Sequence, residues 1–182
     1  MLHSIIKKGS ELSPEELEVM NRERKKVFDS QIEWNEITKE HFFNDLFFVI
    51  KNSENTIVSF GRLIDITVFV EQTPYMILGI GSIVSVTWKK GYGKELMSSM
   101  KKYILEKGKT AVGFCGEQKS EFYRKCGFEI ISQGVKNFVY VDKKGKRNFD
   151  EGDVVYLSGK DGLVEKILNN PHIVIEHEVP HW

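Results

Sequence analysis

The segment that decides the fold reads Ile83-Val84-Ser85-Val86-Thr87-Trp88-Lys89-Lys90-Gly91-Tyr92-Gly93-Lys94. Its first residues complete an isoleucine- and valine-rich run from Tyr75 to Val86, which predicts a buried central strand. Apolar residues then recur at helical spacing, in the order Leu96, Met97, Met100, Tyr103 and Ile104. The sequence therefore predicts a strand that passes through a glycine loop directly into an amphipathic helix, which ends at Gly108.

The start of this helix has the chemistry of an anion site. The first backbone N–H groups of a helix have no internal acceptor, and together with the helix dipole they attract negative charge. Gly91 and Gly93 let a phosphate approach the backbone, and Lys89, Lys90 and Lys94 add positive charge beside it. The segment predicts a phosphate or pyrophosphate site, although a glycine turn that serves only the chain geometry is the alternative.

Two common nucleotide fingerprints do not fit this loop. Trp88 stands where a GxxxxGK loop requires its first glycine, which disfavours a nucleoside triphosphate site. Leu96 stands where GxGxxG requires its third glycine, and the chain does not begin with a βαβ unit, which disfavours a dinucleotide fold. A generic nucleotide-binding α/β protein is therefore the weaker reading.

Outward from this segment, helices precede an antiparallel hairpin. Ser13-Pro14-Glu15-Glu16 has the residues of an N-cap, a first helical turn and a capping box. A partial apolar stripe follows, interrupted by Arg24, and a second helix is predicted over Thr38 to Asp45. Two strands are then predicted, Leu46 to Lys51 and Thr56 to Val70, followed by a turn at Gln72-Thr73-Pro74.

The remainder alternates helices and short strands. Strands are predicted at Thr110–Cys115, Phe128–Ile131, Asn137–Val141, Val154–Leu157 and Ile173–Ile175, and helices at Glu117–Lys125 and Leu163–Leu168. Asn137–Val141 and Val154–Leu157 are expected to pair with each other, joined by the polar segment Asp142 to Asp153. This order predicts an α/β fold with one mixed sheet, in a single domain over residues 1–182.

Composition narrows the function classes. The chain has 182 residues with 26 basic and 26 acidic side chains, so it lacks the basic excess of a nucleic-acid binder. No apolar run reaches the ~18–20 residues that span a bilayer, and the N-terminal residues lack the apolar core of a signal peptide. The two cysteines form no disulfide framework, and the five histidines show no HExxH spacing. We expect a cytoplasmic protein with no metal site, no nucleic-acid partner and no membrane partner.

A second motif follows the glycine loop, in Phe122-Tyr123-Arg124-Lys125-Cys126-Gly127-Phe128. Together the two motifs resemble the GNAT N-acetyltransferase family, whose pyrophosphate loop reads Q/R-x-x-G-x-G/A and whose later helix reads L-Y-x-K-x-G-F. The resemblance extends to the element order of nearly the whole chain. Two positions depart from it: Trp88 occupies the Q/R position unless the loop is one residue shorter and Lys89 takes that role, and Gly116 replaces a frequent asparagine.

The resemblance implies acetyl-CoA as cosubstrate and direct acetyl transfer to a primary amine of a small molecule in a ternary complex. It implies that the pantetheine arm pairs with the strand at Ile83, Val84, Ser85 and Val86. The pyrophosphate is expected on Lys89, Lys90, Gly91, Tyr92, Gly93 and Lys94. Tyr123 matches the family tyrosine that often acts as general acid, and a phenol with a reference pKa near ~10 carries its proton at neutral pH. The alternative is that Tyr123 only packs against the cofactor or core.

The acceptor side is less defined. Many family members place a glutamate on the central strand as base, whereas Tyr75 to Val86 contains no acidic residue. Neighbouring candidates for a base are Glu33, Asp65, Glu71 and Glu117, and catalysis by positioning alone is the alternative. The acceptor site is expected to involve Glu33, Glu71, Glu117 and Trp182.

Three further possibilities stay open at this point. The chain resembles aminoglycoside 2′-N-acetyltransferases diffusely, in length, in the tryptophan before the loop and in Trp182, although it lacks the acidic strand residue that would help to bind a polycationic sugar. The missing strand carboxylate also keeps open a non-catalytic acyl-CoA-binding regulatory module. The sequence leaves the oligomeric state undecided, with a homodimer possible.

Overall fold

The computed structural model describes residues 2–28, 33–142, 144–145, 147–149 and 151–179. The chain forms two compact units, one of Met1–Ile64 with Gly81–Met100 and one of Asp65–Ile80 with Lys101–Trp182. The first contains β1 (His3–Lys8), α1 (Pro14–Lys25), β2 (Leu46–Lys51), short 3-10 turns at Gly9–Glu11 and Lys39–His41, and parts of β3 (Ile57–Val70), β4 (Thr73–Ser85) and α2 (Tyr92–Lys107).

The second unit contains the rest of β3, β4 and α2 and all later elements. These are β5 (Ala111–Cys115), α3 (Glu117–Lys125), β6 (Glu129–Ile131), a 3-10 turn at Gly134–Asn137, β7 (Phe138–Val141), β8 (Arg147–Phe149), β9 (Asp153–Leu157), α4 (Leu163–Asn169) and β10 (Ile175–His177). Hydrogen bonds join the strands in the order β6-β9-β5-β4-β3-β10-β7-β8. In addition, β2 pairs with β3 on one side and with β1 on the other. Only β4–β5 and β10–β7 are parallel among the described pairs. The predicted mixed, mostly antiparallel sheet flanked by helices is confirmed.

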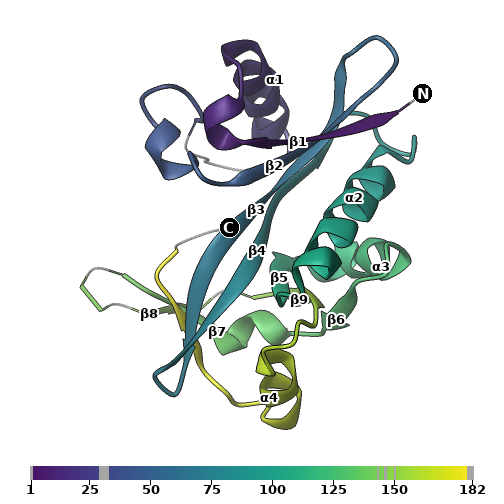
Figure 1. Ribbon diagram of the computed structural model, residues 1–182. Helices are drawn as coiled ribbons and strands as arrows, with labels where there is room; N and C mark the ends of the chain where they lie inside the picture. Colours follow the sequence, from purple (N-terminus) through teal and green to yellow (C-terminus); the bar gives the residue numbers. More distant parts are fainter. Residues whose placement is uncertain (1, 29–32, 143, 146, 150, 180–182) are drawn as a thin grey trace. The chain divides into compact units, whose positions relative to one another are not determined.

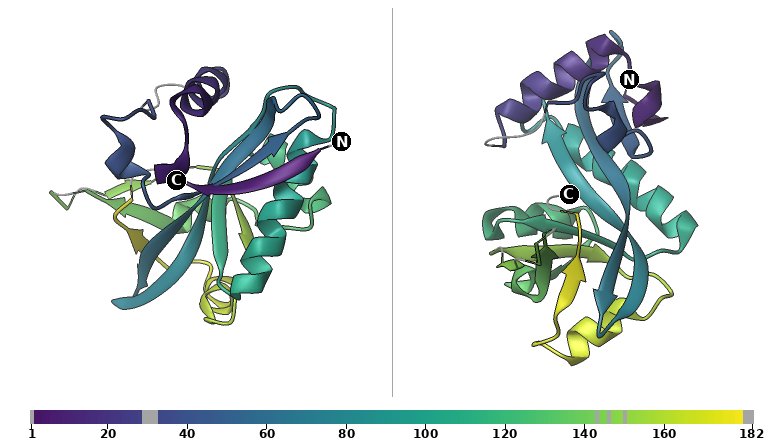
Figure 2. Two further views of the ribbon diagram at one scale, coloured as in Figure 1. Left: turned by 45° about the horizontal axis from the view of Figure 1, so that its top comes forward. Right: turned by 90° about the vertical axis from the view of Figure 1, so that its left-hand side faces the viewer.

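In the first unit the sheet is covered on both faces (Figures 1 and 2). On one face α1 packs over a core of buried residues, which are Leu12, Leu17, Met20, Trp34, Phe42, Phe47, Val49, Ile57, Phe60 and Val84. On the other face, α2 lies so close to Gly61 that a Cβ there would sit 3.3 Å from Met100 Sδ. Burial from both sides explains why β2 reads Leu-Phe-Phe-Val-Ile-Lys without a polar alternation.

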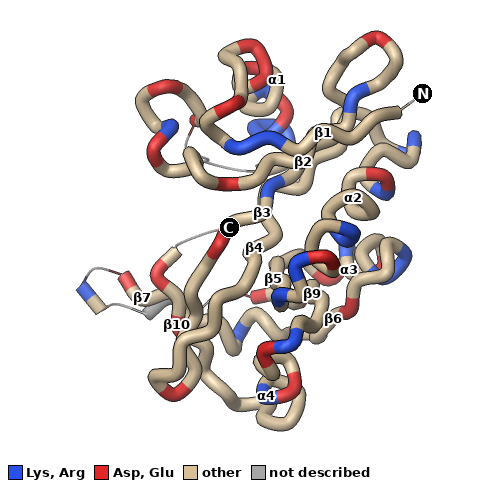
Figure 3. Tube along the Cα trace, in the orientation of Figure 1, with Lys and Arg blue, Asp and Glu red and all other residues tan. Residues whose placement is uncertain are grey.

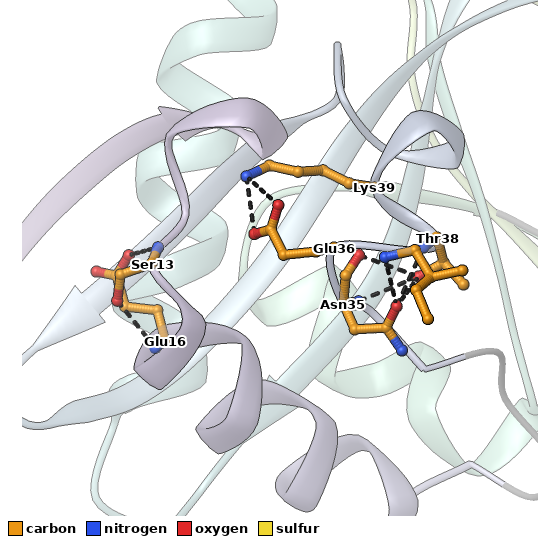
Figure 4. A network of polar contacts seen from close by, with 7 residues as sticks. Ser13, Glu16, Asn35, Glu36, Thr38 and Lys39 are labelled. Atoms are coloured by element: carbon orange, nitrogen blue, oxygen red, sulfur yellow. Dashed lines mark hydrogen bonds and ion pairs between the residues drawn. The ribbon is translucent and has the colours of Figure 1, made fainter.

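The start of α1 confirms the predicted capping box. The Glu16 amide donates to Ser13 Oγ (3.3 Å), and the Ser13 amide donates to Glu16 Oε2 (3.1 Å), as Figure 4 shows. The same carboxylate also forms ion pairs with Lys7 Nζ (2.8 Å) and Lys51 Nζ (3.1 Å). Burial alone would raise the pKa of Glu16, but these hydrogen bonds outweigh it and lower the pKa. A local helix start is thereby tied to strands β1 and β2.

Arg24, which breaks the apolar stripe of α1, is buried against an aromatic ring. Its guanidinium carbon lies 3.5 Å from the centroid of the Trp34 ring, and that of Arg62 lies 5.4 Å away. Burial, followed by repulsion from Arg62, lowers the pKa of Arg24 to about 10. Arg62 is held by Asp45 at 2.8 Å. Trp34 therefore fills the core and also compensates the burial of a cation by a cation–π contact.

We expect Trp34→Ala to lower the free energy of unfolding by about 3–5 kcal/mol, because it leaves a cavity and removes the ring over Arg24. Urea unfolding followed by far-ultraviolet circular dichroism measures the change. Trp88→Ala is the matched control, since the Trp88 side chain is 67% exposed and its loss should change stability by less than about 0.5 kcal/mol. Equal losses in the two variants would contradict the assigned role of Trp34.

In the first unit one prediction was wrong and one strand was missed. The segment Thr38–Asp45 forms only the 3-10 turn Lys39–His41, because Asn35 Oδ1 accepts from the amides of Ile37 (2.9 Å) and Thr38 (3.1 Å). Such side-chain bonds to the backbone compete with helix formation (Figure 4). Strand β1 was not predicted at all, because this edge strand is mostly exposed and carries lysines.

Pairing in the second unit also differs from the prediction. Asn137–Val141 and Val154–Leu157 do not pair with each other: β9 lies between β5 and β6, whereas β7 pairs with β8 and β10. All five residues of β9 are buried, which suits a central position. The β3–β4 turn lies one residue earlier than predicted, at Glu71 and Gln72, whose φ angles of 49° and 67° fit a two-residue hairpin turn.

Candidate functional site

The end of β4 keeps part of its backbone directed away from β3. The Val86 amide donates to the Val58 carbonyl (3.0 Å), and the hydroxyls of Ser85 and Ser59 lie 3.4 Å apart across the two strands. Residues of an antiparallel pair alternate between hydrogen-bonded and non-hydrogen-bonded positions, so the backbone N–H and C=O of Ser85 point to the opposite edge. Along the described chain, the parallel ladder with β5 ends at Ile80.

Ser82 bends the strand just beyond that ladder. Its φ of 52° is in the left-handed region, which non-glycine residues adopt rarely and at a cost. Val84 nevertheless stays buried in the core under α1, and its carbonyl accepts from the buried Ser59 hydroxyl at 2.7 Å. Ile83 faces Gly61, where an added Cβ would lie 2.5 Å from Ile83 Cδ1. The side chains of this segment serve packing, and its free chemistry is that of the backbone.

The loop that follows is exposed. Lys89 and Gly91 have φ angles of 61° and 79°, and space is open where a Gly91 side chain would begin. The Glu95 amide donates to the Gly91 carbonyl (3.1 Å), which makes Gly91 the first acceptor of α2. The amides of Tyr92, Gly93 and Lys94 consequently precede the helical hydrogen-bond ladder, as at any helix start.

The charge around this helix start is positive. Lys89, Lys90 and Lys94 are exposed, and Glu95 is the one acid in the first turn of α2; Figure 3 shows the basic residues at this end in blue. Lysines, helix dipole and open amides act in the same direction on an anion. The indole of Trp88 is exposed beside them.

Tyr123 lies in the second unit, on α3, and is 9% exposed. Its ring packs against Phe122 with centroids 5.2 Å apart. Burial, and then the neighbouring thiols of Cys115 and Cys126, raise the pKa of Tyr123 above its usual value. The hydroxyl is therefore neutral at physiological pH. No hydrogen bond within the described part of the chain engages it.

Two polar residues near Tyr123 were missed by sequence reasoning. Ser120 donates a hydrogen bond to the buried carboxylate of Asp153 at 2.5 Å, and it lies 3.5 Å from Cys115 Sγ. Burial raises the pKa of the Cys115 thiol, so this thiol is not an activated nucleophile. The only sequence signal for the pair is a serine at i−3 from Tyr123, on the same helix face.

The candidate acidic residues are exposed, and three of them, Glu33, Asp65 and Glu117, have a polar partner. Glu33, in the first unit, pairs with Lys25, whose hydrogen bond lowers the pKa of the carboxyl. In the second unit, Asp65 pairs with Lys109 at 2.6 Å, Glu71 lies in the β3–β4 turn, and Glu117 accepts from the Gln133 side chain. Trp182 lies outside the described residues.

The described residues show neither a metal-binding cluster nor a membrane-spanning helix. Among the described residues, no three or more His, Cys, Asp or Glu side chains gather in a way that would hold a metal ion. Within the same residues, no helix has both the length and the apolar character needed to span a bilayer.

Comparison with known proteins identifies the family. The sequence profile of the acetyltransferase (GNAT) family matches residues 12–128, which include the glycine loop, Tyr123 and Gly127. No curated protein sequence matches the chain.

Solved structures share the fold at low sequence identity. The Escherichia coli GNAT N-acetyltransferase YhbS, in complex with CoA, has a TM-score of 0.61 and 16% identity, with 98% of this chain and 91% of that chain covered. An acyl-CoA N-acyltransferase from Pseudomonas aeruginosa has a TM-score of 0.55 and 15% identity over 85% and 97% of the two chains. The catalytic domain of a Tetrahymena histone acetyltransferase, in complex with coenzyme A, has a TM-score of 0.55 and 14% identity over 87% and 93%.

The family match covers more than half of the chain, and the fold agrees with it. Acetyl-CoA is the cosubstrate of this fold, and structural neighbours hold CoA. The strand end, the glycine loop and the tyrosine helix described above all lie within the matched residues. The chain belongs to the GNAT family of acetyltransferases.

Proposed function

We propose that this protein transfers the acetyl group of acetyl-CoA directly to a primary amine of a small molecule, within a ternary complex. The observation that carries the proposal is the start of α2, where amides that precede the helical ladder, two left-handed residues and three lysines stand together. The pyrophosphate of acetyl-CoA binds there, on the backbone of Lys89 to Lys94. The Q/R side chain of the family is absent, so backbone amides and lysines supply the attraction.

The pantetheine arm is the natural partner of the β4 backbone. It contains amide groups, and the N–H and C=O of Ser85 point to the edge opposite β3. Ile83, two residues earlier, presents its backbone on the same edge by the alternation of a strand. In this proposal Val84 and Val86 support the segment from the β3 side and do not contact the ligand through their backbone.

The chemistry follows from the thioester. The amine nitrogen attacks the carbonyl carbon, the new C–N bond forms, and the C–S bond breaks to release CoA as a thiolate. Tyr123 donates its hydroxyl hydrogen to the departing sulfur, and the proton lost by the amine restores the phenol, so that the products are an amide and CoA thiol. Because burial raises the pKa of Tyr123, the hydrogen bond to the developing thiolate contributes more than early proton transfer.

Strand β4 contains no carboxylate, so in this proposal no residue of β4 takes the proton of the amine. The acceptor binds as free base or loses its proton to solvent, and the enzyme contributes by holding it against the thioester. Glu33, Glu71 and Glu117 remain proposed acceptor contacts. As exposed carboxylates they suit a cationic amine, although Glu33 would first have to leave Lys25.

Thermal shift and turnover test the proposal together. Acetyl-CoA and CoA, but not ATP or NAD, are expected to raise the melting temperature. At a ligand concentration of a hundred times Kd, binding adds about 2.7 kcal/mol to the free energy of unfolding. A panel of small primary amines should then release CoA thiol with at least one acceptor. Stabilisation by acetyl-CoA without turnover on any amine would favour the non-catalytic binding module instead. Stabilisation by ATP or NAD alone would exclude both.

A further inference from the structure

Helix α3, which carries Tyr123, is held by few residues. Ser120 and Tyr123 are its two buried residues, and they lie three positions apart, on one face. The remaining residues of this nine-residue helix are exposed, apart from the half-buried Phe122. A short helix with so little apolar surface depends on its polar contacts for a fixed position.

The contact that holds Ser120 is a buried carboxylate. Asp153 is 4% exposed; its Oδ2 accepts from Ser120 Oγ at 2.5 Å, and its Oδ1 accepts from the Gln133 amide at 2.9 Å. No ion pair with Asp153 occurs in the part of the chain that the structure describes. A buried carboxylate without a cation is costly unless its oxygens are hydrogen-bonded, and a bond to a charged acceptor is stronger than a neutral one.

The backbone on both sides of this hydrogen-bonded carboxylate has unusual conformations. Gly152, directly before Asp153, has a φ of 131°, and a Cβ there would lie 2.7 Å from the Cys115 carbonyl oxygen. Gln133, which donates to Asp153, is itself left-handed at φ 54°. The Asp153 carboxylate thus ties the start of β9 to helix α3 and to the turn after β6.

We propose that the Asp153–Ser120 hydrogen bond fixes the position of helix α3 and thereby the position of the Tyr123 hydroxyl for the acetyl-transfer step. The proposal rests on the role proposed above for Tyr123. Ser120 and Asp153 touch neither substrate nor cofactor in it and act through the helix. Because catalysis is sensitive to displacements of about 1 Å, which cost up to ~10²-fold in rate, loosening of α3 should appear in kcat before it appears in binding.

The experiment is a double-mutant cycle on kcat. Ser120→Ala is expected to lower kcat by about 10–10²-fold and to leave the KM for acetyl-CoA within about twofold. In a Tyr123→Phe background the same substitution should have almost no further effect, because the hydroxyl that Ser120 positions is gone. Ser120→Cys, which keeps a weak donor of similar size, should recover part of the rate.

Thr110→Val is the matched control. Thr110 is fully buried in the same unit, and its hydroxyl also donates to a carboxylate, that of Asp161 at 2.7 Å, but it anchors the segment before α4 and not α3. It should lower the melting temperature to a similar extent and leave kcat unchanged. This comparison separates a loss of position from a general loss of stability.

Each outcome decides something. If Ser120→Ala has wild-type kcat, or if its effect adds in full to that of Tyr123→Phe, the positioning role is wrong while the function of Tyr123 stands. If Tyr123→Phe itself is silent, the proposed general acid fails and this inference falls with it. Should Ser120→Ala not fold, Asp153→Ala supplies the second measurement, since it removes the oxygen that accepts from Ser120, and an unchanged kcat in that variant overturns the proposal.

Discussion

Gly91→Asp is expected to bind CoA about 10²–10³-fold more weakly than the wild-type protein while keeping its fold. A carboxylate at this position would face the pyrophosphate, and two like charges about 4 Å apart repel by ~4 kcal/mol at the effective dielectric of a protein surface, which corresponds to roughly 10³ in affinity. The substitution is sterically accepted, because no atom lies within 4 Å of an added Cβ. Isothermal titration with CoA measures the loss.

Two controls separate charge from backbone strain. Gly91→Asn has the same size and tolerates the φ of 79°, so it should lose far less affinity than the aspartate variant. Gly108→Asp places the same carboxylate on a left-handed glycine (φ 64°) that also has open space, at the other end of α2. It should cost some stability and no CoA affinity. Unchanged CoA affinity in a folded Gly91→Asp protein would remove the pyrophosphate from this loop.

Tyr123→Phe should lower kcat by about 10²–10⁴-fold, the range typical of general acid catalysis. The ring is kept, so packing against Phe122 and the affinity for acetyl-CoA should change little. A fall in kcat with a nearly constant KM identifies an interaction made mainly in the transition state. Steady-state kinetics with one verified amine acceptor measures it, together with a pre-steady-state check that chemistry limits turnover.

Tyr123→Ala distinguishes the catalytic role from a packing role. If Tyr123 only packs in the core, the phenylalanine variant keeps its full kcat, whereas the alanine variant loses about 3–5 kcal/mol of stability. If Tyr123 is the acid, both variants lose kcat to a similar extent, and only the alanine variant loses stability. A phenylalanine variant with wild-type kcat would end the general-acid assignment.

Helix boundaries were predictable where their chemistry is local. The capping box of Ser13 and Glu16 begins α1, Gly108 follows α2, and α3 spans Glu117–Lys125 as the sequence predicts. Strand pairing was less predictable, because the partner of a strand is chosen by burial across the whole sheet. The insertion of β9 between β5 and β6 has no signal in its immediate neighbours.

The glycine loop of the proposed site could be predicted from the sequence, whereas the strained residues and the side-chain contacts around it could not. A glycine at position 91 indicates a left-handed conformation in the sequence. Ser82 and Lys89 give no such indication, because non-glycine residues adopt positive φ only when the surrounding structure imposes it. In the sequence Arg24 only interrupts an apolar stripe, because its contact with the ring of Trp34, from a later loop, exists only in the folded chain. Ser120 and Asp153, 33 positions apart, likewise show no common pattern in the sequence.

Strand β3 is covered along one edge by two strands that are made at very different times. β2 precedes it in the chain and covers Ile57–Leu63, whereas β10 covers Val68–Val70 and follows after most of the second unit. During synthesis on the ribosome, β2 is therefore available to the first half of β3 from the start, whereas the partner of the second half does not exist until Ile175 has been synthesised. An open apolar edge is a template for pairing with another chain. We therefore expect this edge to be a point of aggregation for the nascent protein in the interval between the synthesis of Val70 and that of Ile175.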